Sequence, residues 1–336
     1  MDKGTQGKIL SEAGISVYEI GLKKGTKFVS GIRKLRKTSK KINPDVIHGW
    51  MYHGALFSLM SGVKAPKIMA IRHSLDDIKK DKPLTRLVIK LLAFLSKRFD
   101  AVIYNSITSR SQHEAAGYCS SQSVVIPNGF DTNAFSPSND FRLQFRKENN
   151  IPASAIVFGN VARYHHIKNH HGLIEAFALF LRERPGAYLI LAGQGVDDNN
   201  AEITEATDKH GIGDNVLLMG ERKDIPDLLN ALDAYVSASM GEAFPNVIGE
   251  AMSCGIPCIA TAVGDTAAII KDTGLLVPSG SSHSLAEALG RFALIPNDER
   301  VSLGKKARQR ILENYQQKEY AALHEELYRR LAVKKQ

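Results

Sequence analysis

Two cationic side chains, Arg163 and Lys168, lie five residues apart in a segment that follows a strand-like apolar run. The arginine guanidinium binds phosphate oxygens through a planar fork, whereas the lysine ammonium acts as a compact point charge. In one loop they could clamp a diphosphate. The spacing alone is equally consistent with an ordinary surface loop.

A second segment, residues 240–255, places two carboxylates beside a predicted helix start. Pro245 stands where the helix would begin, and a glycine closes it. The backbone amides of residues 244–247 would point out of the helix N-terminus, which is a ready anion site. Glu242 would lie before the helix and Glu250 just over one turn inside it, where ionised carboxylates can accept hydrogen bonds from sugar hydroxyls. The alternative is one carboxylate near a cap and one solvated helix residue.

These segments must be positioned by the strands before them. Strand-like and helix-like segments alternate along the chain, which indicates an α/β protein with parallel sheets. A helix over His171–Arg184 would bury Leu173, Ile174, Phe177 and Leu181. Six strands are predicted in the second half, enough for a doubly wound domain that binds ligands at the carboxyl ends of its strands. They are Ala155–Gly159, Ala187–Ala192, Asn215–Met219, Ala234–Ala238, Pro257–Thr261 and Leu275–Val277.

The first half of the chain contains fewer strand-like segments than the second. Asn128–Gly129 and Pro137 supply turn residues suited to a linker between the halves. Residues 301–332 predict two amphipathic helices, with Tyr315, Tyr320, Leu323, Leu327 and Leu331 available for docking. Five strands are predicted before the linker: Ile15–Ile20, Asp45–His48, Lys67–Ile71, Ala101–Tyr104 and Ser123–Ile126.

Composition excludes several classes of protein. The 336 residues are 43% apolar and 24% charged, which argues against disorder. Apolar runs fall short of the roughly 20 residues that a spanning helix needs, and the first ten residues lack the apolar core of a secretory signal. Three cysteines cannot build a disulfide framework or an evident metal site, so we expect a cytoplasmic protein.

Charge is distributed unevenly along the chain. Residues 1–150 hold 25 Lys and Arg against 12 Asp and Glu, whereas the rest holds 19 against 23, and these net charges of +13 and −4 sum to the overall +9. The run from Lys23 to Lys41 contains nine basic residues and no acidic one. A basic first half suggests an anionic partner, although a solvated helix face is an equal alternative.

Taken together, the motifs resemble those of the family 4 retaining glycosyltransferases, which have the GT-B architecture. The resemblance covers roughly residues 5–320. Glu242-x7-Glu250 and the following EAMSCGIPCIATAVGDTAAII resemble the family's E-x7-E signature and the strand and turn after it. Residues 159–175 are similar to its Arg…Lys donor-phosphate loop. Ile126–Asp131 and Tyr104–Ser106 resemble its interdomain segment and the strand end before that segment.

The resemblance implies a role for each matching residue. Arg163 and Lys168 would hold the nucleotide diphosphate, Glu250 the ribose hydroxyls and Glu242 the transferred sugar. His73 resembles a first-domain histidine near the donor sugar, although a lone histidine is more often structural, which leaves the two interpretations of His73 about equal.

Backbone contacts are also implied by the resemblance. Amides near Phe244, Pro245 and Asn246 would touch the donor, and the Gly220–Asp224 turn, with Arg222, would border the base. The Gly193-Gln-Gly195 turn lacks the third glycine of a dinucleotide-binding fingerprint, so we do not assign it that role.

The implied fold is α/β GT-B, with two Rossmann-like doubly wound domains that face each other across a cleft. We expect an acceptor-side domain over residues 1–135, a donor domain over 136–312 and a C-terminal helix over 313–336 that packs back toward the first domain. The usual N-terminal strand and glycine-rich loop are not recognised, so we expect the first domain to be N-terminally incomplete.

The expected function is transfer of a sugar from a nucleotide-diphosphate donor, UDP- or GDP-linked, to a saccharide or polyprenyl-linked acceptor. The resemblance implies retention, no cofactor and no obligatory metal. We expect a role in bacterial-type surface polysaccharide synthesis and peripheral contact of the basic first half with an anionic membrane. The main alternative is a catalytically silent nucleotide-sugar-binding homologue. A nucleotide-sugar epimerase is a lesser alternative, and a nucleic-acid binder is disfavoured because no recognition motif is present.

Overall fold

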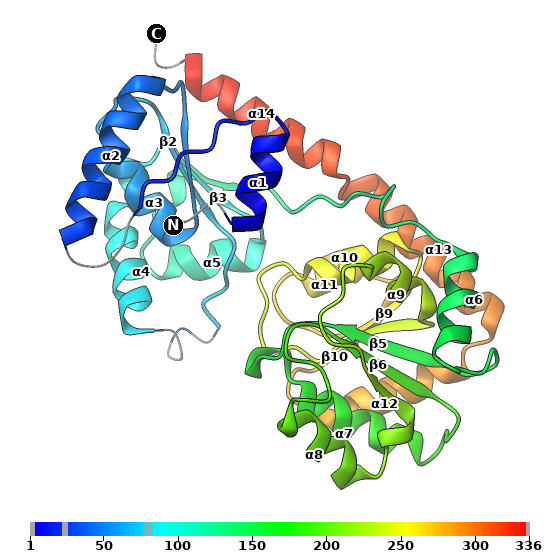
Figure 1. Cartoon of the computed structure of the whole chain (residues 1–336). Coiled ribbons are helices and arrows are strands. Elements are labelled where there is room, and N and C mark those ends of the chain that lie inside the picture. The colour runs from blue at the N-terminus through cyan, green and yellow to red at the C-terminus, as the bar shows by residue number, and fades with distance from the viewer. Residues whose placement is uncertain (1–3, 22–25, 77, 79–81, 334–336) are drawn as a thin grey trace.

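The computed structural model describes residues 4–21, 26–76, 78 and 82–333. Two α/β domains, each built on a parallel sheet, are joined by an extended linker and by the C-terminal helices (Figure 1). The α/β fold with two parallel sheets was the expectation from the sequence, and it is confirmed.

The sheet of the second domain has the doubly wound strand order. Within the described residues it contains six parallel strands in the order β10-β9-β8-β5-β6-β7. The order reverses between β5 and β8, and this switch point is where such sheets bind ligands. Each strand lies within two residues of its predicted position. The strands are β5 (Val157–Val161), β6 (Tyr188–Ala192), β7 (Val216–Leu218), β8 (Ala234–Ser237), β9 (Cys258–Thr261) and β10 (Gly274–Val277).

Helices cover both faces of this sheet. Helix α7 buries Leu173, Ile174 and Phe177 against it, as the predicted apolar face requires. Asp233 binds Arg142 and Arg146 and thereby anchors α6 to the start of β8. The helices are α6 (Asn139–Glu148), α7 (His170–Leu181), α8 (Ala201–His210), α9 (Ile225–Ala231), α10 (Asn246–Ser253), α11 (Thr266–Ile270) and α12 (Ser282–Leu294), with 3-10 turns η4 (His166–Lys168) and η5 (Gly213–Asn215).

The first domain has strand order β1-β2-β3-β4 among the described residues. Successive residues alternate between two cores, with Met69 and Ile71 on one face and Ile68 and Ala70 on the other. Its strands are β1 (Ile47–Trp50), β2 (Lys67–Ile71), β3 (Ala101–Tyr104) and β4 (Ser123–Val125). Its helices are α1 (Gly4–Glu12), α2 (Thr26–Ile42), α3 (Met51–Leu59), α4 (Pro83–Leu95) and α5 (Ile107–Ala115), with 3-10 turns η2 (Ser96–Arg98) and η3 (Ser120–Gln122).

The prediction of a strand over Ile15–Ile20 is wrong. These residues belong to no strand or helix, and among the described residues β1 pairs with β2 alone. The side chains of Ile15 and Tyr18 are 54% and 50% exposed. A strand needs a hydrogen-bonded neighbour as well as alternating side chains, and this segment has no such neighbour in the described part of the chain.

The C-terminal helices return the chain to the first domain. Helix α13 (Asn297–Asn314) lies on the second domain, and α14 (Gln317–Val333) covers one face of the first sheet (Figure 1). Leu327 and Leu331 are buried there as predicted, whereas Leu323 is 45% exposed and does not dock. Phe130 of the linker pairs with Gln316, so the two connections between the domains lie side by side.

No helix in the described residues is both long enough and apolar enough to cross a membrane.

Candidate active site

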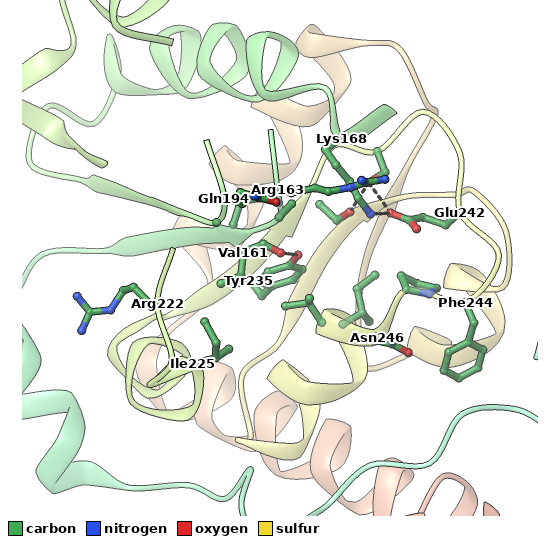
Figure 2. A pocket seen from close by; sticks show the side chains of 18 of the residues that line it. Val161, Arg163, Lys168, Gln194, Arg222, Ile225, Tyr235, Glu242, Phe244 and Asn246 are labelled. Atoms are coloured by element: carbon green, nitrogen blue, oxygen red, sulfur yellow. Dashed lines mark hydrogen bonds and ion pairs between the residues drawn. The ribbon is translucent and has the colours of Figure 1, made fainter. Parts of the chain in front are cut away.

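A cavity of about 490 Å³ opens at the switch point of the second sheet, between the carboxyl ends of β5 and β8 (Figure 2). Strand order alone therefore predicts its place. We call it the donor-site cavity, after the ligand that the sequence leads us to expect there, and most of the candidate residues line it. They are Arg163, Lys168, Arg222, Glu242, Phe244, Pro245 and Asn246.

The two cations lie at one end of the donor-site cavity (Figure 2). The Lys168 ammonium donates a hydrogen bond to Oε1 of Glu242, which also accepts a hydrogen bond of 2.8 Å from Oγ of Ser239. Within the described residues the exposed Arg163 guanidinium has no hydrogen bond or ion pair. One cation is therefore fixed by a carboxylate, and the other is available to an anionic ligand.

Helix α10 presents its N-terminus to the same cavity. The helix starts at Asn246 after Pro245, and no side chain caps its first amides. Phe244 is buried, with its ring between those of Phe130 and Tyr315 at 6.1 and 5.9 Å, so it faces the domain junction. Its contribution to the donor-site cavity is therefore its backbone. The start of α10 lies where the sequence predicted it, and its uncapped amides are available to an anion.

Glu250 lies one turn further along α10 and does not line the donor-site cavity. Its carboxylate is half-buried and has no hydrogen-bond or ion-pair partner among the described residues. Burial raises the pKa of Glu250 to about 6. A carboxylate in this state gains by accepting hydrogen bonds from a ligand.

Arg222 occupies the opposite end of the donor-site cavity and points away from the other two cations (Figure 2). Its guanidinium forms a two-point ion pair with Asp224, and it stacks on the ring of Phe145 at 5.6 Å. These contacts fix the side chain as part of the wall. They also satisfy much of its hydrogen-bonding capacity, so Arg222 is less available to an anionic ligand than Arg163.

Several wall residues were not found from the sequence. Gln194 lies in the Gly193–Gly195 turn, which failed as a dinucleotide fingerprint but still borders the cavity. Gly193 has φ +142°, and a Cβ there would meet the Ala162 carbonyl oxygen at 2.2 Å. Only glycine allows this close approach. Ser239 was missed because a serine after a strand carries no distinct signal.

His73 lies outside the donor-site cavity, on the first domain. It lines a second cavity of about 560 Å³ between the domains, and Arg163 and Gly241 line the same space from the second domain. The ring of Tyr52 packs edge-on to that of His73, and Nδ1 of His73 is buried without a partner in the described structure. Arg163 is shared, so the interdomain cavity adjoins the donor-site cavity.

The family of the chain follows from its similarity to known protein families. Residues 141–310, half of the chain, match the family described as Glycosyl transferases group 1. The chain is a member of this family. Residues 6–134 match Glycosyltransferase Family 4, so the resemblance found in the sequence is confirmed.

Individual glycosyltransferases are similar over part of their length. The chain is 30% identical to the lipopolysaccharide core biosynthesis mannosyltransferase LpsB of Rhizobium meliloti, over 59% of this chain and 57% of that protein. It is also 30% identical to the UDP-Gal:alpha-D-GlcNAc-diphosphoundecaprenol alpha-1,3-galactosyltransferase of Escherichia coli, over 50% of this chain and 44% of that protein. The chain thus matches about half the length of these curated relatives.

The fold of this glycosyltransferase family member is GT-B. The crystal structure of Anabaena Alr3699/HepE, in complex with UDP and glucose, superposes with a TM-score of 0.84 at 23% identity. The superposition covers 96% of this chain and 89% of that one. In the described part of the chain no three His, Cys, Asp or Glu side chains converge as a metal site would require.

Proposed function

We propose that this family member transfers a sugar from a nucleoside-diphosphate donor to a saccharide or lipid-linked acceptor, with retention of anomeric configuration. The observation that carries the proposal is the convergence of Arg163, Lys168 and the uncapped α10 N-terminus on one cavity. Retention comes from the resemblance to family 4.

The proposed chemistry depends on charge that develops on the leaving diphosphate. Arg163, Lys168 and the amides at the start of α10 would stabilise this charge from fixed positions. Preorganised donors of this kind need no reorganisation during the reaction and supply a large part of many rate enhancements. The proposal assigns this work to the protein's own groups and includes no metal or cofactor.

Glu242 would hold the transferred sugar. Its ion pair with Lys168 joins the proposed sugar site to the proposed phosphate site. Glu250, on α10 just beyond the cavity wall, would accept hydrogen bonds from the ribose hydroxyls. The wall with Gln194 and Arg222 would border the base. We favour an enzyme over a silent nucleotide-sugar-binding homologue because Arg163, Lys168 and Glu242 lie together at one cavity.

The acceptor would enter the interdomain cavity that His73 lines. The related Escherichia coli protein is named for a diphosphoundecaprenol-linked substrate, and the Rhizobium meliloti protein for lipopolysaccharide core biosynthesis. We therefore propose an acceptor of the surface-polysaccharide class, presented at the cytoplasmic face of a membrane.

Two helices of the first domain support membrane contact. Leu84, Leu87, Leu91 and Phe94 form an exposed apolar stripe along α4, and Phe94 is 80% exposed. Lys82 to Arg98 contains five basic residues and no acidic one, and the basic residues of α2 from Arg33 to Lys41 are exposed. An apolar stripe with basic flanks complements an anionic bilayer.

The function can be tested by mixing the protein with UDP- or GDP-hexoses and a polyprenyl-diphosphate-linked N-acetylhexosamine. We expect release of nucleoside diphosphate and, by NMR, a product with the donor's anomeric configuration. The Arg163→Ala/Lys168→Ala variant should be inactive. An inverted product would contradict retention, and donor binding without turnover would favour the silent homologue.

A further inference from the structure

One carboxylate of the second domain caps a helix of the first. Asp265 accepts hydrogen bonds from Oγ of Ser106 at 2.9 Å and from the backbone amides of Ile107 and Thr108 at 2.8 and 3.0 Å. These donors form the N-terminus of α5. The Asp265 side chain is therefore buried at the domain junction and satisfied from across it.

Asp265 does not cap its own helix. It precedes α11 in the N-cap position, yet its side chain makes no capping hydrogen bond there. A carboxylate near a helix N-terminus also gains from the helix dipole, and here that helix is α5. The N-terminus of α11 thus lacks a side-chain cap, and the carboxylate that could supply it contacts α5 of the other domain.

The backbone of Asp265 is tied to the Glu242 loop. Its amide donates to the carbonyl of Ala243 at 3.1 Å. Gly264, just before it, has φ +53°, and a Cβ at this position would lie 2.2 Å from the carbonyl oxygen of Glu242. The two loops therefore lie in direct backbone contact, and the Asp265 carboxylate cannot shift far without Glu242.

On the other side, the start of α5 holds the His73 loop. The backbone amide of Ser109 donates a hydrogen bond of 3.0 Å to Oγ of Ser106. Oγ of Ser109 in turn donates a hydrogen bond of 2.6 Å to the backbone carbonyl of His73. An unbroken series of contacts thus runs from Glu242 through Asp265 and Ser109 to His73.

We propose that Asp265 is a positioning residue that fixes His73 of the first domain relative to Glu242 of the second. This inference rests on the proposed function, which places Glu242 at the transferred sugar and His73 on the adjoining cavity for the acceptor. Asp265 lines neither the donor-site cavity nor the interdomain cavity, so it acts only through the two loops. Its three bonds all cross the domain junction, so separation of the domains breaks them together.

The Asp265→Asn variant tests this proposal through kinetics. In this variant the side-chain amide nitrogen replaces one carboxylate oxygen and would face a hydrogen-bond donor of α5. At least one of the three hydrogen bonds to residue 265 is therefore lost. A misplacement of about 1 Å can cost roughly a hundredfold in rate. We expect kcat to fall about tenfold to a hundredfold while the donor KM changes less than about threefold. Asp272→Asn, an exposed carboxylate seven residues later, is the matched control and should leave both constants unchanged.

Two further variants separate positioning from stability. Ser109→Ala removes the bond to His73 and should lower kcat in the same way, and combining it with Asp265→Asn should add little. A melting temperature lowered by Asp265→Asn with kcat unchanged would overturn the proposal, since a purely structural cap would behave in that manner. Fully multiplicative losses in the double variant would also contradict the connection.

Hydrogen exchange keeps the test independent of the proposed function. In the wild type the amides of Ile107 and Thr108 should be protected, and Asp265→Asn should expose them whether or not the enzyme turns over. Absence of this effect would refute the interdomain cap itself. Absence of transfer by the wild type, with the exchange effect present, would refute the proposed function and not the cap.

Discussion

The Lys168 ammonium and the Glu242 carboxylate, 74 residues apart in the sequence, form a hydrogen-bonded ion pair at the carboxyl ends of β5 and β8. These strands are the neighbours at which the strand order reverses. The pair therefore joins the two loops that carry the proposed phosphate and sugar contacts. Only 26% of the Lys168 side chain and 14% of the Glu242 side chain are exposed, so solvent screens the pair weakly.

Glu242→Gln should separate binding from turnover. Glutamine keeps the size of the side chain but removes the charge that pairs with Lys168. We expect the dissociation constant of UDP or GDP to change little, because the phosphate cations remain. The value of kcat should fall by about a hundredfold, in the range seen when one preorganised group is removed. Glu183→Gln, an exposed carboxylate on the second domain, is the control. Equal losses in affinity and kcat would place Glu242 in general donor binding instead.

Glu250 should make donor affinity depend on pH. Burial raises its pKa to about 6, so it is protonated below that value and ionised above it. Ribose hydroxyls donate to the ionised form, so affinity should fall as the pH decreases. If only the ionised form binds, UDP-glucose or GDP-mannose should bind roughly tenfold more weakly at about pH 5 than at about pH 7.

Two controls show whether Glu250 causes this pH dependence: a ligand that does not itself titrate, and a variant without the carboxylate. The diphosphate of an intact nucleotide sugar does not titrate in this range, unlike that of free UDP. Calorimetric titration of Glu250→Gln should give weaker binding with no pH step near 6. A step of the same size in the variant would assign the titration to another group.

The Asp233 ion pairs should stabilise the second domain. Although burial alone would raise the pKa of this carboxyl, Arg142 and Arg146 hold it below its ordinary value of 3.8. Asp233→Asn leaves the buried Arg146 without its charge partner, so we expect the free energy of unfolding in urea to fall by about 3–5 kcal/mol at neutral pH.

The pH dependence of this stabilisation follows from the sign of the shift. A carboxyl with a lowered pKa in the folded state stabilises the protein above about 3.8, and this contribution is lost as the pH falls toward the folded value. The difference between the wild type and Asp233→Asn should therefore shrink in acid. The exposed Asp272→Asn should behave as the wild type, and a difference that grows in acid would reverse the assignment.

The apolar stripe of α4 should bind anionic vesicles. A fully buried leucine or phenylalanine gains about 1.5–3 kcal/mol, so Leu87→Gln/Phe94→Gln should bind phosphatidylglycerol vesicles at least about tenfold more weakly in sedimentation. Leu294→Gln, on the second domain at 69% exposure, is the matched control. Equal binding of all three proteins, or binding that ignores salt and lipid charge, would contradict the membrane contact.

Much of the second domain could be predicted because its signals are local. The strand positions follow from short apolar runs, and Pro245 marks the start of α10. Gly255, with φ +73°, ends it in the left-handed conformation that glycine favours. The strand order then places the Arg163 loop next to the Glu242 loop, so the donor-site cavity follows from the pattern.

The remaining features depend on partners that the sequence does not reveal. The Asp265 contacts join residues up to 159 positions apart, and locally this aspartate looks like the cap of α11. The apolar and β-branched residues of Ile15–Ile20 fit a strand, but their types do not say whether a neighbour is present to pair with it. Arg222 looks like a ligand cation until its partner Asp224 is seen in place.

The most direct test of the central claim is a thermal-shift titration of the wild type and Arg163→Ala/Lys168→Ala with UDP, GDP, ADP and NAD. Charge-assisted contacts are worth about 1.5–3 kcal/mol each, so the variant should lose most of the affinity. We predict that one nucleoside diphosphate stabilises the wild type and that the variant shows no shift. Stabilisation of both proteins to the same extent, or of neither, would contradict a donor-diphosphate site at the carboxyl ends of β5 and β8.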